Sequence, residues 1–558
     1  MKAKYILISI LAACSLTFTS CELDFDPTDV IKGESVSAEN FDQMMLPMYN
    51  RFWFDFNDKF YYGLGDGMSY NVLAPGSGYI NPFNNLSVTG TSEGLQNAWS
   101  SFYIVVQQSN KIMKDIKNNS SVSDEEKAPF LAEGRFMRGL AYWHLVSLWE
   151  NVILSEDPAK LIENPLVNVH TLKDGYEFAI RDMEYAAKYL PEISKDKGRV
   201  NKYSAYGMLS RFYLAYSGLV ASGYGANWDC GVRDEHYLDL ARKAAEKVIL
   251  NSSFRLMENY QHLFMVTHNS NPEGVFAFQW AMGSSNQAGW GNTNSQQRFL
   301  AFTSELTGGD AWGGYTFCPW NMLNEYAEDD TIRRKATWMG YGDVYTPDNA
   351  GFSFTYTQNV ASNGDGTTGS NQLNVKKGVT GSSRDNSNIG NQNSALNNYM
   401  MRLAEVYLNY AEAILGNNAS TTNGEALKYF NEVRLRAGLQ PLTSINKDII
   451  LKERRIEFCM EGRYWYDLVA RSYYDRQWVI NYLNGQDRGT RPSYIFTAPN
   501  NARINESGTP TLVTVGTAAA GTFRLPYPET DLIKNPKMNQ PPVSYEFTED
   551  RIPESELF

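Results

Sequence analysis

Residues 399–415 read YMMRLAEVYLNYAEAIL, and the apolar side chains of this stretch recur with the spacing of an α-helix. From residue 403 onward they stand at i, i+3, i+4, i+7, i+8, i+11 and i+12, which are Leu403, Val406, Tyr407, Tyr410, Ala411, Ile414 and Leu415. Residues at these positions share one stripe of a helix. The segment therefore predicts an amphipathic helix that packs by one face.

The same spacing recurs over most of the chain. Residues 93–250 are predicted to form successive amphipathic helices, and residues 399–471 resume the pattern after a long interruption. Helices of this length with short polar turns suit helix hairpins stacked as in a tetratricopeptide array, although the fixed period of that repeat is not legible. We therefore predict a mainly α fold. The tryptophans on helix stripes are assigned to its core: Trp99, Trp143, Trp149 and Trp465.

The interruption, residues 251–398, is rich in Gly, Asn, Ser and Trp. Short strand-like runs occur at 274–280 (GVFAFQW) and 352–358 (FSFTYTQ), between long irregular segments. A second irregular region is predicted at 477–523. Long loops inside a compact protein are usually functional. We expect these two regions to form a loop-rich layer against the helices.

The N-terminus has the layout of an export signal. Two lysines precede an apolar stretch that ends in Thr19-Ser20-Cys21, which is similar to a bacterial lipobox with Cys21 as the acylated residue. Several acyl chains on one residue make a stable membrane anchor. Cys14, after Leu11-Ala12-Ala13, is a rival with a shorter apolar core. Ordinary secretion with a structural Cys21 is the third alternative.

Charge and cysteine content exclude several classes of function. The net charge is −12, and removal of residues 1–20 would take away Lys2 and Lys4 and bring it to −14. Nucleic acid and anionic membrane surfaces are therefore poor partners. Outside the signal region three cysteines lack paired spacing, and no H-E-x-x-H sequence is present. We predict no metal or cofactor; a structural calcium ion stays open but is not indicated.

Several stretches together resemble the SusD-like (RagB/SusD) surface lipoproteins of bacterial glycan-uptake systems. The match is best in the C-terminal half, and its segments are RLAEVYLNYAEA at 402–413, NEVRLRAGL at 431–439, ERRIEFCMEGRYWYDLVAR at 453–471 and RLPYPETDLIKNPKMNQ at 524–540. One departure follows the first long helix, where the family usually has Gly and Pro and this chain has Glu150-Asn151-Val152. Five charged residues of segment 453–471 look like a catalytic cluster but are interpreted as intrahelical ion pairs and contacts to the neighbouring hairpin: Glu453, Arg454, Arg455, Glu457 and Glu461.

The resemblance implies a single domain over residues 21–558, with four tetratricopeptide-like helix pairs as scaffold and a variable loop-rich face. It also implies attachment to the outer membrane at the cell surface through Cys21. The implied partner is a SusC-like TonB-dependent transporter, over which the lipoprotein closes as a lid. The implied function is capture of an oligosaccharide or polysaccharide without catalysis.

Sugar capture needs flat aromatic surfaces for the C–H faces of the rings and polar side chains for the hydroxyl groups. The stretches 278–298 and 308–322 contain this mixture in Gly-rich surroundings. The candidate ligand-binding residues are Trp290, Trp312, Tyr315, Trp320, Asn292, Asp310 and Arg298. A second candidate stretch, 64–85, contributes Asp66 and Tyr79 in a predicted loop. The alternative is that the tryptophans pin long loops to the scaffold.

Two rival functions remain. A surface glycoside hydrolase would use a pair of carboxylates, and the available acids are Asp310, Glu325, Asp329 and Asp330. A lid of the same fold for a peptide importer would favour backbone-pairing edges over exposed rings. The Trp, Tyr, Asn and Gly content of residues 278–322 favours a glycan.

Overall fold

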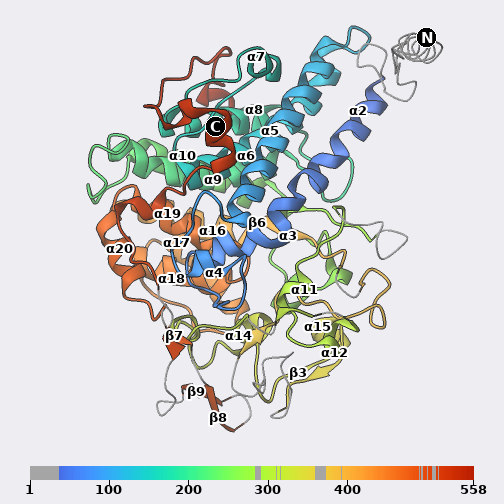
Figure 1. Cartoon of the computed structure of the whole chain (residues 1–558), viewed down its shortest axis with the longest axis vertical. Coiled ribbons are helices and arrows are strands. Elements are labelled where there is room, and N and C mark those ends of the chain that lie inside the picture. The colour runs from blue at the N-terminus through green and yellow to red at the C-terminus, as the bar shows by residue number, and fades with distance from the viewer. Residues whose placement is uncertain are drawn as a thin grey trace, which may run out of the picture.

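The computed structural model describes residues 37–282, 291–309, 311–313, 316–357, 373–390, 393–488 and 515–558, and four short strands between 490 and 512. Figure 1 shows helices gathered in its upper part and a loop-rich part below them. Cys14, Cys21 and the whole predicted signal lie outside the described residues. Within the described ranges no helix has both the length and the apolar character needed to cross a membrane.

Eight helices make the scaffold. They are α5 (Glu93–Asn118), α6 (Asp124–Trp149), α8 (Leu172–Tyr189), α9 (Lys202–Ala221), α10 (Glu235–Asn251), α16 (Leu403–Leu415), α17 (Gly424–Arg436) and α18 (Lys447–Glu457). From α5 to α16 each helix packs on the next, and α16 also contacts both α17 and α18. The prediction of a mainly α fold built from helix pairs is confirmed. One pair, α10 with α16, is separated in sequence by the whole predicted loop layer.

The central helices are more buried than one apolar stripe requires. In α6 every residue from Leu131 to Trp149 is buried, because α5 and α8 both pack against it. A capping box stabilises the first turn of α6. The Ser123 side chain accepts a hydrogen bond from the Glu126 backbone N–H, and the Glu126 side chain accepts one from the Ser123 backbone N–H. All four tryptophans assigned to the core are buried.

The described residues of 252–402, between α10 and α16, form a loop-rich layer. Its strands are β1 (Gly274–Phe278), β2 (Trp338–Met339), β3 (Val344–Tyr345), β4 (Phe354–Thr355), β5 (Asn374–Val375) and β6 (Asn398–Arg402). Its short helices are η5 (Tyr260–Phe264), η6 (Val266–His268), α11 (Gln297–Leu300), α12 (Ser304–Thr307), α13 (Trp320–Leu323), α14 (Thr331–Thr337) and α15 (Pro347–Ala350). The strands predicted in 274–280 and 352–358 are confirmed as β1 and β4.

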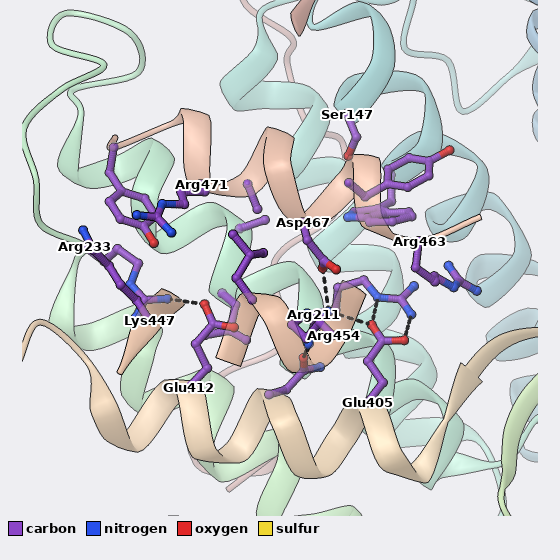
Figure 2. A pocket seen from close by; sticks show the side chains of 18 of the residues that line it. Ser147, Arg211, Arg233, Glu405, Glu412, Lys447, Arg454, Arg463, Asp467 and Arg471 are labelled. Carbon is purple, nitrogen blue, oxygen red and sulfur yellow. Dashed lines mark hydrogen bonds and ion pairs between the residues drawn. The ribbon is translucent and has the colours of Figure 1, made fainter. Parts of the chain in front are cut away.

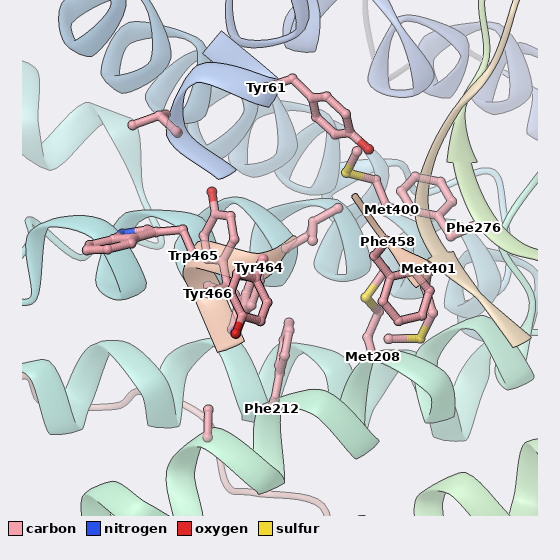
Figure 3. Close-up of a cluster of buried hydrophobic side chains, with 14 of the residues drawn as sticks. Tyr61, Met208, Phe212, Phe276, Met400, Met401, Phe458, Tyr464, Trp465 and Tyr466 are labelled. Atoms are coloured by element: carbon pink, nitrogen blue, oxygen red, sulfur yellow. The ribbon is translucent and has the colours of Figure 1, made fainter. Parts of the chain in front are cut away.

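The layer shares its core with the scaffold. Strands β1 and β6 pair antiparallel, with Gly274 opposite Arg402 and Phe278 opposite Asn398. Figure 3 shows Met401 of this ribbon beside Met208 of α9, and the ring of Phe276 meets the ring of Phe136 of α6 edge-on, with centroids 5.1 Å apart. Two-stranded ribbons are marginal alone, so this packing is what holds the ribbon in place.

The segment after α18 corrects one predicted boundary. Helix α19 (Tyr464–Ser472) is followed by α20 (Arg476–Asn484), so residues 477–484 are helical and not irregular. Trp478 of α20 stacks on Tyr482 of the same helix, with ring centroids 5.2 Å apart, and on the Arg471 guanidinium. These contacts are made within α20 and to the end of α19, and the amino-acid composition of a loop does not reveal them.

The remaining elements lie before α5, after α20 or between α6 and α8 in the chain. Before the scaffold lie α2 (Ala38–Met45), η2 (Leu46–Tyr49), η3 (Arg51–Trp53), α3 (Phe54–Tyr62), η4 (Gly63–Gly67) and α4 (Asn81–Asn84). After α20 lie β7 (Thr490–Arg491), β8 (Tyr494–Ala498), β9 (Asn501–Ile504), β10 (Thr511–Leu512), η9 (Ala520–Phe523), α21 (Glu529–Lys534), η10 (Pro536–Asn539) and η11 (Glu554–Glu556). Helix α7 (Pro158–Glu163) lies beside the C-terminal segment at the top of Figure 1.

The charged residues of segment 453–471 pair between elements and not along their own helix. Glu457 contacts Arg402 of β6, Arg436 of α17 and Arg333 of α14. Glu453 contacts Arg333 as well. The expected intrahelical pairs are therefore wrong, while the expected contact to the neighbouring hairpin is correct. Their physical role is to join the helical scaffold to the loop layer through buried ion pairs.

Candidate functional site

Two of the candidate stretches identified in the sequence, 64–85 and 308–322, are joined by backbone hydrogen bonds. Leu73 and Phe317 form an antiparallel bridge, in which each backbone N–H donates to the other residue's carbonyl at 2.9 and 2.7 Å. The bridge joins the stretch 64–85 to the stretch 308–322, although they are far apart in sequence. This contact brings Tyr79 and Trp312 to the same part of the loop layer.

Trp312 presents an indole ring to solvent. It is 49% exposed, whereas Trp280 nearby in the layer is 5% exposed. The backbone N–H of Trp312 donates to the carbonyl of Arg298 at 2.7 Å, and the N–H of Gly313 donates to that of Ala301 at 2.8 Å. Gly313 is needed there, because an added Cβ would lie 2.3 Å from the Leu300 carbonyl carbon. The segment that carries Trp312 is thus fastened to α11.

Phe299 of α11 links the exposed ring to Tyr79. Its ring meets the ring of Trp312 edge-on, with centroids 5.5 Å apart and planes at 72°. It meets the ring of half-buried Tyr79 in the same way at 6.4 Å and 73°. Edge-to-face pairs of this kind are favourable. The three rings form one cluster that we call the aromatic platform: Tyr79, Phe299 and Trp312.

Arg298 lies beneath this platform rather than on its surface. It is 8% exposed, and its guanidinium carbon lies 4.8 Å from the centroid of the Trp312 ring and 4.6 Å from that of Phe299. Its Nη2 is 3.8 Å from Oδ1 of buried Asp58 on α3. Burial lowers the pKa of Arg298, and the Asp58 carboxylate opposes that shift. The predicted ligand contact of Arg298 is therefore replaced by contacts within the protein.

Asp66 corrects a second predicted site residue. It lies in η4 and not in a loop, and it is fully buried. Its carboxylate accepts hydrogen bonds from the backbone N–H groups of Met460 (2.9 Å) and Gly462 (2.7 Å) and from Nδ2 of Asn71 (3.0 Å). Burial outweighs these bonds and raises the pKa of Asp66 to about 6. Asp66 holds the corner between α18 and α19 and does not face a ligand.

Of the other five candidates, the structure describes Asn292 and Trp320. Asn292 is exposed, and its carbonyl accepts the N–H of Ala281 at 3.0 Å. Trp320 is half-buried against the core at the start of α13, which favours the loop-pinning alternative for this ring. The other three, Trp290, Asp310 and Tyr315, lie outside the described residues.

Sequence reasoning missed Phe299. It follows Arg298 in the run QQRFL, where nothing distinguishes a ring that supports a surface from one that fills the core. Tyr79, Arg298 and Trp312 are the predicted residues that the structure brings together.

A cavity inside the helical scaffold is the first alternative site. Figure 2 shows Arg211 facing Glu405 and Arg454 pointing at Asp467. The cavity has a volume of about 50 Å³, which suits a few water molecules and no sugar ring. Burial alone would raise the pKa of Glu405, but the charges of Arg211 and its neighbours lower this pKa to about 2. These groups are internal ion pairs, and we assign them no ligand.

A surface groove beside α21 is the second alternative. It has a volume of about 720 Å³, and its lining includes Thr89, Thr91, Arg524, Tyr527 and Glu529. Its aromatic side chain, Tyr527, is 5% exposed and so offers no ring face for stacking. The aromatic platform is therefore the better candidate for a sugar.

Two of the acids considered for a hydrolase are held in ion pairs, and two histidines contact each other. Asp330 is paired with Arg333, and Glu325 with Arg455. His262 and His268 stack with ring centroids 4.3 Å apart. Among the described residues no set of three or more His, Cys, Asp or Glu side chains is placed to hold a metal ion.

Comparison with known proteins gives consistent matches. A model described as "SusD family" matches residues 249–544, and one described as "Starch-binding associating with outer membrane" matches residues 66–214. A SusD-like protein of Bacteroides ovatus is 37% identical, over 98% of this chain and 99% of its own.

Solved structures agree in fold over nearly the whole chain. A crystal structure with a xylogluco-oligosaccharide is 36% identical, with a TM-score of 0.81 over 91% of this chain and 100% of that one. A laminarin-binding SusD-like protein is 21% identical, with a TM-score of 0.66 over 89% of this chain and 97% of that one, and shares the fold.

Proposed function

Because the chain belongs to the SusD family, we propose that it is a cell-surface lipoprotein that captures a glycan for a SusC-like TonB-dependent transporter, over which it closes as a lid. The observation that carries the proposal is the half-exposed indole of Trp312, set on the aromatic platform with Tyr79. An aromatic ring supported on one side and open on the other suits the apolar C–H face of a sugar.

We propose Trp312 and Tyr79 as the residues that contact the glycan. Asn292 lies exposed in the same layer and has an amide that suits sugar hydroxyl groups. The relative solved with a xylogluco-oligosaccharide and the laminarin-binding relative support an oligosaccharide or polysaccharide as ligand. These two glycans are the first to test.

We propose that the protein binds and does not hydrolyse the glycan. A hydrolase needs two carboxylates at a set separation around the bond to be cut. Two of the acids available to a hydrolase, Glu325 and Asp330, are held in ion pairs with arginines. Release of new reducing ends from any glycan on incubation with purified protein would contradict this part of the proposal.

We propose anchoring in the outer membrane through lipidated Cys21. The support is the lipobox-like sequence before Cys21 and the match of residues 66–214 to a family described by its association with the outer membrane. Mass analysis of the mature N-terminal peptide distinguishes Cys21 from Cys14. Cys21→Ala is expected to release the protein from membranes; incorporation of labelled fatty acid by that variant would contradict the assignment.

The binding experiment is affinity electrophoresis against a glycan panel, followed by calorimetry of Trp312→Ala with a responsive glycan. Loss of one stacked ring is expected to cost about 1–2 kcal/mol, or about tenfold in Kd, without a change in Tm. Tyr224→Ala is the matched control, because Tyr224 is 43% exposed beyond α9 in the scaffold. Unchanged affinity in Trp312→Ala would refute the site, and binding of peptides but no glycan would favour the peptide-importer alternative.

A further inference from the structure

We propose that Arg298 is the positioning residue of the aromatic platform: it holds the Trp312 ring from beneath in the orientation that receives the sugar. The effect of Arg298 on sugar binding rests on the proposed glycan-binding function. The contact by which Arg298 holds the Trp312 ring rests on the structure of the protein.

The Trp312 ring needs such a support. Backbone hydrogen bonds at Trp312 and Gly313 fix the chain but leave the two side-chain torsions of the indole free. A half-exposed side chain loses conformational entropy when a ligand orders it, and this loss weakens binding. A ring that is already held in place avoids the loss.

Arg298 provides the support through its planar guanidinium. A guanidinium carbon 4.8 Å from the indole centroid is within the range of a cation–π contact. The same group lies 4.6 Å from the Phe299 centroid, so one cation contacts both rings that meet at 72°. A planar group can stack on a ring face in a way that an ammonium cannot.

Arg298 is itself held by the scaffold. Asp58 lies on α3, is 6% exposed, and places Oδ1 3.8 Å from Nη2 of Arg298. The same oxygen accepts a hydrogen bond from Ser295 in the layer. The contacts thus run from α3 through Asp58 and Arg298 to the exposed ring. A ligand-binding residue would instead present its guanidinium to solvent, and Arg298 is 8% exposed.

The first test is a double-mutant cycle on glycan affinity, by calorimetry, with Arg298→Met, Trp312→Ala and the double variant. Arg298→Met keeps the side-chain stem and removes the cation; it is expected to weaken binding about tenfold. In the Trp312→Ala background the same change is expected to have no further effect, because Arg298 acts through Trp312. Additive losses would overturn the proposal, since they would mean that Arg298 touches the glycan itself.

Two further variants separate positioning from loss of fold. Arg298→Lys keeps the charge but not the planar group and is expected to lose affinity nearly as Arg298→Met does. Arg298→Met with Asp58→Asn removes the Asp58 carboxylate together with the cation beside it and is expected to keep the wild-type Tm while binding stays weak. Arg242→Met, on the surface of α10, is the control for loss of an arginine and is expected to bind normally. Full affinity in Arg298→Lys would overturn the role of the planar group.

The second test needs no ligand. In protein labelled with 5-fluorotryptophan, the Trp312 signal is assigned by its absence in Trp312→Phe. Arg298→Met is expected to shift that signal towards that of free 5-fluorotryptophan and to leave the other tryptophan signals unchanged. An unchanged Trp312 signal overturns the proposal. If instead the signal shifts but Trp312→Ala binds the glycan normally, the positioning holds and the proposed binding site fails.

Discussion

Arg402 is the residue whose loss tests most directly how the loop layer is fastened to the scaffold. It is 1% exposed at the end of β6. Its guanidinium contacts Glu273 at 2.6 Å, Glu457 at 2.9 Å and Glu461 at 2.8 Å. Glu457 belongs to α18, whereas Glu273 precedes β1 in the layer. One buried cation therefore joins three carboxylates from both parts of the molecule.

The variant Arg402→Met removes the cation while keeping a long apolar side chain. Arg436 still contacts Glu273 and Glu457, and Lys377 still contacts Glu461. One buried negative charge is nevertheless left without compensation. Removing one member of a buried pair costs about 3–5 kcal/mol.

The cost converts to a shift in melting temperature through the unfolding entropy. Without residues 1–20 the chain has 538 residues (558 minus 20). At about 2.1 cal/mol/K per residue the unfolding entropy is about 1.1 kcal/mol/K. A loss of about 4 kcal/mol therefore lowers Tm by about 4 °C.

The assay is calorimetric melting of wild type, Arg402→Met and the surface control Arg242→Met. Arg242 pairs with Asp239 and Glu246 on the exposed face of α10, so its loss is expected to change Tm by less than about 1 °C. Limited proteolysis is expected to cut Arg402→Met faster within residues 252–402. A Tm for Arg402→Met equal to that of the control would refute the reasoning.

Three other outcomes follow from the same physical arguments. Glu150→Gly is expected to stabilise the protein by about 1 kcal/mol in urea unfolding, because Glu150 has φ 60° and its carboxylate lies 3.9 Å from Arg476, too far for a hydrogen bond; a lower midpoint would contradict this. Folding lowers the pKa of Glu405 and of Glu457 from 4.5 to about 2, since surrounding arginines outweigh burial, so the stabilisation is complete above pH 4.5 and is lost as pH falls towards 2. Protonation of the two carboxylates should lower the free energy of unfolding by about 4 kcal/mol between pH 6 and pH 3. A Tm that does not change over that range would exclude this contribution. Asp66→Asn is expected to cost about 2 kcal/mol because an amide cannot accept all three hydrogen bonds, yet to leave glycan affinity unchanged; weaker binding at wild-type Tm would restore Asp66 to the site.

Helical spacing predicted most of the architecture. The stripe that begins at Leu403 became α16, and the tryptophans assigned to the core are buried. The predicted boundary at 477 failed because α20 is held by contacts of Trp478 with Arg471 and Tyr482. Loop composition carries no information about such contacts.

The residues around the aromatic platform were predicted in part. Exposed aromatic residues in Gly-rich surroundings identified Trp312 and Tyr79, and polar composition nearby identified Arg298. Composition could not separate Asp66, which bonds to backbone N–H groups of the corner after α18, from an acid that faces solvent. Burial depends on which distant segment covers a residue, and local sequence does not specify that.

The sequence by itself determined the helix-pair scaffold and the position of the loop layer, because helical periodicity is a property of neighbouring residues along the chain. Tertiary structure alone decided which rings stay exposed and which charges become internal supports. Phe299 joins Tyr79 to Trp312, and Arg298 turns inward to Asp58, through contacts between residues far apart in sequence. Such contacts exist only after the layer has packed on the scaffold.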